Sequence, residues 1–291
     1  MESLIFLVEK WDGIIKARTC ANGSTQRVYY NKEDSASPTA SIESIFITSI
    51  IEAAECRDIA IVDIPNAFIQ TNVGKDKDGD NIIMKVRGPL VDMLVELDPV
   101  LYKDMVEIEK GKKVLYLVVK KAIYGMPQSA LLFYKKLRGD LEEQGFKVNP
   151  YDPCTANKMI NGAQCTVVWH VDDLKVSHKD PKVIDKFVKW VSHKYGDKEI
   201  GEVKAKRGRV HEYLGMVEEW GHNPLPILRN WSIDLFLQRE TISTSDASSE
   251  EAHNISNLYF RTGNTDQFYK TEWISDQIIK LLWLLTNPIL T

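Results

Sequence analysis

The chain has 291 residues, of which 44% are hydrophobic and 27% charged, and its formal net charge is -4. This length and apolar content predict a globular protein with one large domain or two small ones. A mildly acidic chain excludes a general basic field for nucleic acid, so any such binding must depend on local clusters of Lys and Arg.

The four cysteines are widely spaced, without the close pairs of zinc or redox motifs, so we expect reduced thiols in an intracellular protein. The apolar run at residues 4–8 follows no basic region, and the run at residues 278–285 is short and interrupted by Lys280. A membrane-spanning helix needs about 20 apolar residues. We therefore expect neither a secretion signal nor contact with a membrane.

The first strongly periodic segment, residues 41–55, predicts an amphipathic helix. We expect an apolar face and a polar face: Ile42, Phe46, Ile50 and Ala53 on the first, and Ser44, Thr48, Glu52 and Glu55 on the second. A β-rich run at residues 58–64 follows directly and contains Asp63. Pro65 then ends this predicted strand.

The middle of the chain continues with a polar loop at residues 74–80 and strands at residues 82–86 and 114–119. Between these strands, residues 89–113 are helix-like and then polar. Residues 129–145 have apolar side chains at helical spacing and end at a glycine, so they predict a helix.

Two further β runs, residues 165–171 and 174–176, are separated only by Asp172 and Asp173, which is the spacing of a β-hairpin. Asp180 followed by Pro181 predicts the start of another helix. After about residue 217 the pattern loosens. The order helix, strand, helix, hairpin, helix predicts an α+β fold with an antiparallel sheet flanked by helices.

Asp63, Asp172 and Asp173 are the chemically suggestive residues, because an aspartate at a strand end and two in a hairpin can converge on divalent ions. Hard carboxylate oxygens suit magnesium. The ordinary alternative is that an Asp-Asp pair merely favours a turn and that Asp63 ends its strand. The aspartates alone do not decide between these two explanations.

The surrounding blocks resemble copia-type retrotransposon reverse transcriptases. Seven segments carry the resemblance, in the order found in that family: residues 12–18 (DGIIKAR), 62–68 (VDIPNAF), 121–128 (KAIYGMPQ), 131–137 (LLFYKKL), 149–154 (NPYDPC), 169–173 (WHVDD) and 211–216 (HEYLGM). The chain departs from the family at His170, where many relatives have Tyr, and at Ala130, where Pro is frequent. The blocks imply a fingers and palm domain over residues 12–217, an N-terminal extension at 1–11 and a divergent tail at 218–291.

The resemblance implies that Asp63, Asp172 and Asp173 are catalytic and bind two Mg²⁺ ions, with Mn²⁺ as a substitute. Phe68 would screen the sugar of the incoming nucleotide and so favour deoxynucleotides, and Gln128 lies in the block next to that nucleotide. We expect Lys16 and Arg18 to reach its triphosphate, with strand-surface solubility as their alternative role. The remaining candidates would contact primer and template, with a solvated face as the alternative for the two lysines: Lys204, Lys206, Tyr213, Leu214 and Gly215.

The resemblance thus implies an RNA-directed DNA polymerase that takes an RNA template, a DNA primer and deoxynucleoside triphosphates. Such a protein would work in the cytoplasm, within a virus-like particle, or in the nucleus. The main alternative is a catalytically silent, truncated copy that keeps the palm fold and weak nucleic-acid binding. A two-metal hydrolase is a further alternative, because the same ions can activate water.

Overall fold

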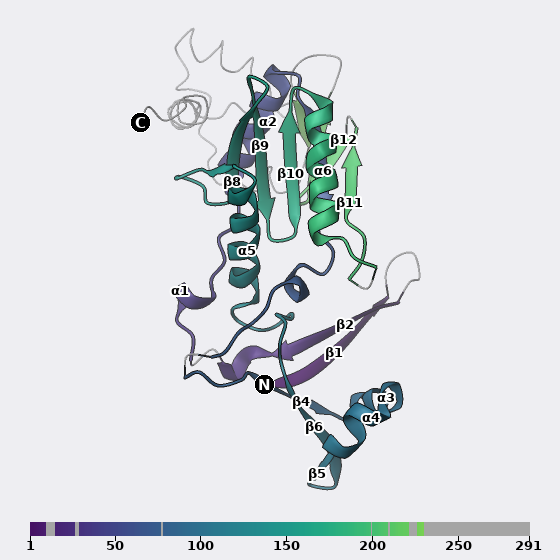
Figure 1. Cartoon of the computed structure of the whole chain (residues 1–291). Helices are drawn as coiled ribbons and strands as arrows, with labels where there is room; N and C mark the ends of the chain where they lie inside the picture. Colours follow the sequence, from purple (N-terminus) through teal and green to yellow (C-terminus); the bar gives the residue numbers. More distant parts are fainter. Residues whose placement is uncertain are drawn as a thin grey trace, which may run out of the picture. The chain divides into compact units, whose positions relative to one another are not determined.

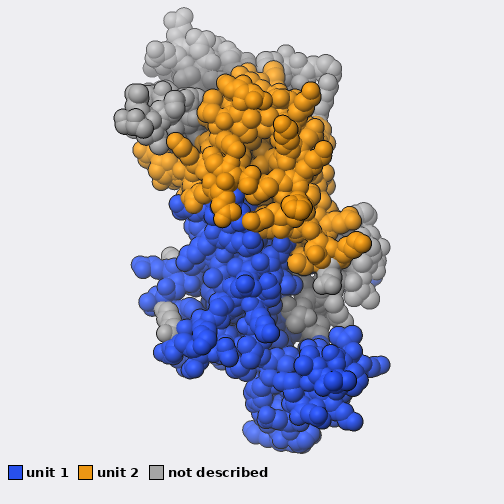
Figure 2. All heavy atoms as spheres, in the orientation of Figure 1, with its two compact units in different colours: residues 1–38, 66–140 blue, residues 39–65, 141–291 orange. Residues whose placement is uncertain are grey.

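The computed structural model divides the chain into two compact units, which are coloured separately in Figure 2. Unit 1 comprises residues 1–38 and 66–140, and unit 2 comprises residues 39–65 and 141–291. The structure describes the following residues: 1–9, 15–26, 29–76, 78–198, 200–208, 210–220 and 226–229. The predicted tail at 218–291 therefore lies almost wholly outside the described residues, and the predicted domain boundaries stay predictions.

Unit 1 contains, among its described residues, a five-stranded sheet in the order β2-β1-β4-β6-β5. Neighbouring strands are antiparallel except β1 and β4, which are parallel. The strands are β1 (Glu2–Glu9), β2 (Ile15–Asn22), β4 (Ile83–Arg87), β5 (Glu107–Glu109) and β6 (Lys112–Val118). Short helices connect them: η1 (Gly23–Gln26), α1 (Lys32–Ser35), η2 (Ala67–Gln70), α3 (Pro89–Leu97), α4 (Pro99–Tyr102) and η3 (Lys103–Met105).

A close backbone crossing fixes part of unit 1. The amide of Ala21 donates a hydrogen bond to the carbonyl of Tyr124 at 2.7 Å, next to Gly125. Gly125 has φ +88°, and a Cβ there would stand 2.0 Å from the carbonyl oxygen of Ala21. Only glycine allows both the left-handed conformation and this approach.

Unit 2 is built on an antiparallel sheet that has six strands among the described residues, in the order β11-β3-β10-β9-β8-β7. Helix α2 (Ile42–Ala54) covers one face and helix α6 (Pro181–Tyr195) the other, as Figure 1 shows. The strands are β3 (Asp58–Asp63), β7 (Lys147–Val148), β8 (Thr155–Ile160), β9 (Ala163–His170), β10 (Asp173–His178) and β11 (Lys204–Arg207). A smaller antiparallel sheet holds β12 (Val210–Tyr213), β13 (Met216–Trp220) and β14 (Pro226–Arg229). These sheets and helices confirm the predicted α+β class.

Helix α5 (Ser129–Glu143) and helix α6 form where periodicity and capping predicted them. In α5 the predicted apolar stripe is buried, since Phe133, Leu137 and Leu141 are each fully enclosed. In α6 the carboxylate of Asp180 accepts a hydrogen bond from the Lys182 amide, which caps the helix before Pro181. Local signals were sufficient in both cases.

The predicted faces of α2 are wrong, although the helix itself is confirmed. Ile42, on the predicted apolar face, is 40% exposed, whereas Thr48 and Glu52, on the predicted polar face, are 2% and 1% exposed. The buried hydroxyl of Thr48 donates to backbone carbonyls of its own helix, and Glu52 pairs with Lys175 of β10. Polar side chains on this helix thus find partners inside unit 2.

The position of the hairpin turn also differs by one residue. His170 pairs with Asp173, so the connecting residues are Val171 and Asp172, and Asp173 is the first residue of β10. Val171 has φ 56°, which is costly for a β-branched residue, by about 1–3 kcal/mol. The prediction put the turn at Asp172 and Asp173 because Asp is a frequent turn residue.

Two expectations concern chemistry rather than fold. The cysteines are all free, with Cys154 and Cys165 buried and Cys56 exposed. Among the helices that the structure describes, none is long and apolar enough to cross a membrane.

Candidate active site

A row of four ionisable residues crosses one end of the unit 2 sheet. Asp63 of β3 lies opposite Asp173 of β10 on one side and opposite Lys204 of β11 on the other. Asp173 in turn lies opposite His170 of β9. Directly opposed residues of antiparallel strands point to the same face of a sheet. The register therefore gathers two carboxylates, one ammonium and one imidazole on one face.

Asp172 joins this row through the hairpin turn. Its carbonyl accepts a hydrogen bond from the Ile64 amide at 3.0 Å, which ties the turn to the residue after Asp63. The left-handed conformation of Val171 shapes the same turn. Asp63, which lies about 110 positions earlier in the sequence, is thus brought to the same sheet end as Asp172 and Asp173.

The electrostatics of Asp173 reflect this crowding. Burial raises the pKa of its carboxyl above the ordinary value, and the negative charges of Asp172 and Asp63 raise it further. His170 acts in the opposite direction and lowers this pKa. A bound cation would offset the negative charges that Asp172 and Asp63 place beside the Asp173 carboxyl.

The residues fit a hard divalent ion in their chemistry, because carboxylate oxygens are the ligands such ions prefer. Their side chains do not form a preassembled site: among the described residues, no group of three or more His, Cys, Asp or Glu could hold a metal ion as placed.

Comparison with known proteins now decides the family. The family model of reverse transcriptase (RNA-dependent DNA polymerase) matches residues 8–217, which is most of the 291-residue chain. The chain belongs to this reverse transcriptase family. No curated protein matches the chain. Among solved structures, it is similar to telomerase from Candida albicans in complex with a TWJ fragment of telomeric RNA, with 10% identity and a TM-score of 0.37. That match covers 76% of this chain and 46% of the telomerase chain.

Beneath the aspartates, this family member has a supporting layer. The Tyr213 side chain is 1% exposed, and its hydroxyl lies 3.2 Å from the Val168 carbonyl and 3.3 Å from the Asp173 carbonyl. It packs in a core cluster with Ile61 and Met216. Tyr213 thus supports the strand that begins at Asp173, and its predicted contact with the primer or template stays a prediction.

The other predicted primer or template residues of the reverse transcriptase lie near this layer. Lys204 and Lys206 are exposed on β11 and alternate along it with Ala205. Leu214 and Gly215 form the turn between β12 and β13, both with positive φ. Leu214 packs against the same core cluster as Tyr213.

Sequence reasoning missed a buried ion pair on the same face. Lys175 lies two residues beyond Asp173 on β10, and its ammonium is 2.8 Å from the Glu52 carboxylate and 2.7 Å from the Ser49 hydroxyl. The side chains of Lys175 and Glu52 are 0% and 2% exposed. The available signal was a lysine flanked by the apolar residues Leu174 and Val176 in a predicted strand.

The predicted nucleotide-binding residues all belong to unit 1. The Phe68 ring packs against Tyr124 with centroids 4.6 Å apart. Gln128 is 6% exposed, and its amide donates to the Tyr30 hydroxyl at 3.2 Å. Lys16 and Arg18 lie on β2, where they pair in register with β1. The structure brings the aspartates together in unit 2 and leaves the nucleotide-binding roles of these four residues as predictions.

Proposed function

We propose that this chain is the RNA-directed DNA polymerase domain of a copia-type retrotransposon, which extends a DNA primer along an RNA template. The observation that carries the proposal is the convergence of Asp63, Asp172 and Asp173 in a member of the reverse transcriptase family. Aspartates that served only to form a turn would have no reason to lie opposite a third carboxylate on the neighbouring strand. The copia-type assignment is supported by the order of the sequence blocks.

In this proposal the three aspartates hold two Mg²⁺ ions, or Mn²⁺ in their place. When bound, such ions activate the attacking primer hydroxyl and stabilise the leaving pyrophosphate. Asp173 contributes a carboxylate whose pKa is raised by burial and by the charges of Asp172 and Asp63, and a bound cation would favour its charged form. Tyr213 positions Asp173 through the backbone carbonyl of that residue.

The cationic residues have a separate role in the proposal. Lys204 lies opposite Asp63, where its ammonium would pair with a backbone phosphate of the primer or template, and Lys206 extends the same strand. Lys16 and Arg18 would bind the triphosphate, while Phe68 would screen the sugar and Gln128 would lie beside the base. We propose the cytoplasm, inside a virus-like particle, or the nucleus as the place of action.

Magnesium-dependent primer extension on an RNA template tests the proposal. We expect Asp63→Asn and Asp173→Asn to lower the rate by at least about a hundredfold, because each removes charge stabilisation at the reacting centre. Asp58→Asn is the matched control, since Asp58 stands at the opposite end of the same strand, and it should retain activity. Full activity in Asp172→Asn combined with Asp173→Asn would refute the assigned roles.

The alternative is a catalytically silent remnant that retains a folded palm and weak nucleic-acid binding. It predicts no nucleotide incorporation by the folded chain, while salt-sensitive RNA binding persists. The two hypotheses are separated by measuring incorporation and binding on the same preparation, with its folding established by circular dichroism.

A further inference from the structure

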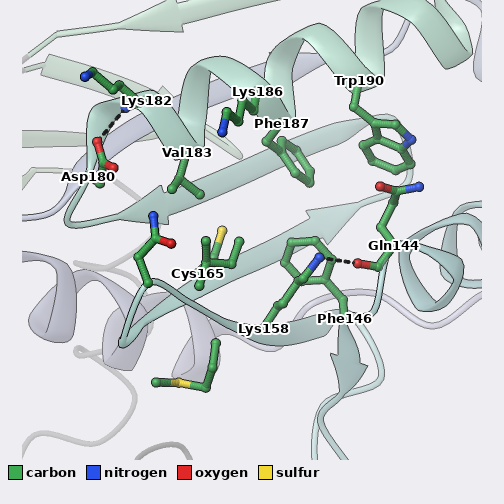
Figure 3. Close-up of a pocket in the computed structure, with 13 residues that line it drawn as sticks. Gln144, Phe146, Lys158, Cys165, Asp180, Lys182, Val183, Lys186, Phe187 and Trp190 are labelled. Carbon is green, nitrogen blue, oxygen red and sulfur yellow. Dashed lines mark hydrogen bonds between the residues drawn. The ribbon is translucent and has the colours of Figure 1, made fainter.

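A second candidate site lies in unit 2, in a slot of about 530 Å³ beneath helix α6. Figure 3 shows it between this helix, the segment that follows α5, and the hairpin of β8 and β9. Its volume falls in the range of small-ligand sites, roughly 300–1,000 Å³. None of the residues assigned to polymerase chemistry lines it.

The floor of the slot is aromatic and apolar. The rings of Phe146 and Phe187 meet edge to face with centroids 5.8 Å apart, and Trp190 packs on Phe187 at 5.4 Å. Cys165 is fully buried at the base, and burial raises the pKa of its thiol to about 12, so it stays uncharged at neutral pH. This floor suits an aromatic or large aliphatic group.

The rim carries excess positive charge. Lys158, Lys182 and Lys186 line the slot together with a single carboxylate, Asp180. That carboxylate already accepts the capping hydrogen bond of α6. The Lys158 ammonium donates to the carbonyl of Gln144. Within the described part of the chain, the ammonium groups of Lys182 and Lys186 make no hydrogen bond or ion pair, so they are available to an anionic ligand.

The position of the slot on the sheet argues against the nucleic acid that the polymerase copies. In the register of β9 and β10, Trp169 lies opposite Leu174, whereas His170 lies opposite Asp173. Cys165 lies four residues before Trp169 on β9, so it shares the face of Trp169 and points away from the face of Asp173. A primer and template bound at the aspartates would lie on the other face of the sheet.

The packing of the aromatic rings leads to the same conclusion. Phe146 and Phe187 are only 5% and 6% exposed, so neither offers an open ring face on which a base could stack. The slot beside these rings has a volume of about 530 Å³, which leaves room for an inserted side chain. A protein segment therefore fits this slot better than single-stranded RNA.

We propose that the slot binds a short acidic segment of a partner protein, with an aromatic or large aliphatic side chain on the floor. Asp or Glu residues flanking that anchor would pair with Lys182 and Lys186. This recognition combines a buried apolar anchor with charge complementarity at the rim. It is independent of polymerase activity, because it uses the opposite sheet face.

The test is a selection of phage-displayed random peptides on the whole folded chain, followed by fluorescence anisotropy with the enriched peptides. We expect enrichment of Asp or Glu beside Trp, Phe or Leu, and binding that weakens as salt rises. Lys186→Glu should weaken binding by about tenfold, because it replaces attraction with repulsion at the rim. Lys189→Glu is the matched control, since Lys189 is exposed on the same helix and does not line the slot.

The proposal would be overturned if the selected peptides showed no enrichment of Asp or Glu, or if Lys186→Glu and Lys189→Glu bound the peptides with equal affinity. It would also be overturned if Lys186→Glu kept its affinity for the peptides but lost binding to an oligouridine strand. The last outcome would identify a nucleic-acid contact. Primer extension by Lys186→Glu should equal that of the unchanged chain whether or not the polymerase proposal holds. Circular dichroism of both variants verifies that the fold is intact.

Discussion

The buried pair of Lys175 and Glu52 permits the sharpest test of the packing beneath the proposed active site. Lys175→Met leaves Glu52, which is 2% exposed in its side chain, as a buried charge without its counter-ion. Removing one partner of such a pair costs about 3–5 kcal/mol. Because a domain has only about 5–15 kcal/mol of stability, this single change should remove a large part of it.

The double variant Lys175→Met with Glu52→Leu distinguishes a costly orphan charge from a generally important contact. Replacing both ions by apolar groups of similar size is often neutral or stabilising, so the double variant should be more stable than Lys175→Met alone. Lys206→Met is the matched control. Lys206 and Lys175 both lie opposite Ile61, but Lys206 is exposed on the edge strand, so its change should stay within about 0.5 kcal/mol.

Hydrogen exchange of the β10 amides in urea is the appropriate assay, because it reports the free energy of opening unit 2 rather than that of the whole chain. The expected loss corresponds to an increase in exchange of roughly a hundredfold or more. A loss below about 1 kcal/mol in Lys175→Met would refute the reasoning. The reasoning would also be refuted if the free energy lost in the double variant equalled the sum of the losses in Lys175→Met and Glu52→Leu, since the two charges would then be uncoupled.

Three further predictions concern other parts of the chain. Asp173 has a raised folded-state pKa, so its ionisation destabilises the fold as pH rises through the window between its ordinary and raised pKa. Asp173→Asn should therefore melt at a higher temperature at neutral pH, and this difference should disappear below the ordinary carboxyl pKa. Gly125→Ala should cost roughly 3 kcal/mol or more in urea unfolding, whereas Gly111→Ala, with positive φ but open space, should cost about 1 kcal/mol. In the folded chain, iodoacetamide should label exposed Cys56 readily and leave Cys165 unmodified, as mass spectrometry of the digest would show, because that thiol is buried and its pKa is about 12.

The secondary structure around the aspartates could be predicted because its signals are local. The strand ending at Asp63, the hairpin before Asp173 and the helix that starts at Pro181 follow from β-branched runs, spacing and capping. The convergence of the aspartates came from the resemblance to a family, since spacing alone left a turn as the ordinary explanation. Only the strand register of the structure shows that Asp63 lies directly opposite Asp173.

The inward face of α2 could not be predicted from the helix itself. Its polar side chains are buried because a lysine about 120 positions later in the chain, Lys175, meets Glu52 and Ser49. A hydrophobicity pattern assigns Glu52 to solvent, since a carboxylate is rarely buried without a partner. Whether such a partner exists depends on contacts between distant parts of the chain. For the same reason the sequence could not show that Tyr213 packs behind Asp173.

Three energetically unfavourable features of unit 2 bear on the choice between an active polymerase and a silent remnant. The positive φ of Val171, the raised pKa of Asp173 and the buried charge of Lys175 all lie on β10 or its turn. A fold under no catalytic demand would gain stability from a residue that tolerates positive φ and from a neutral side chain at Asp173. Backbone strain and carboxylate repulsion gathered at one sheet end are typical of functional sites, and a bound cation would relieve the repulsion. This pattern favours the active enzyme. It would lose its force if magnesium failed to raise the melting temperature of the unchanged chain more than that of Asp173→Asn.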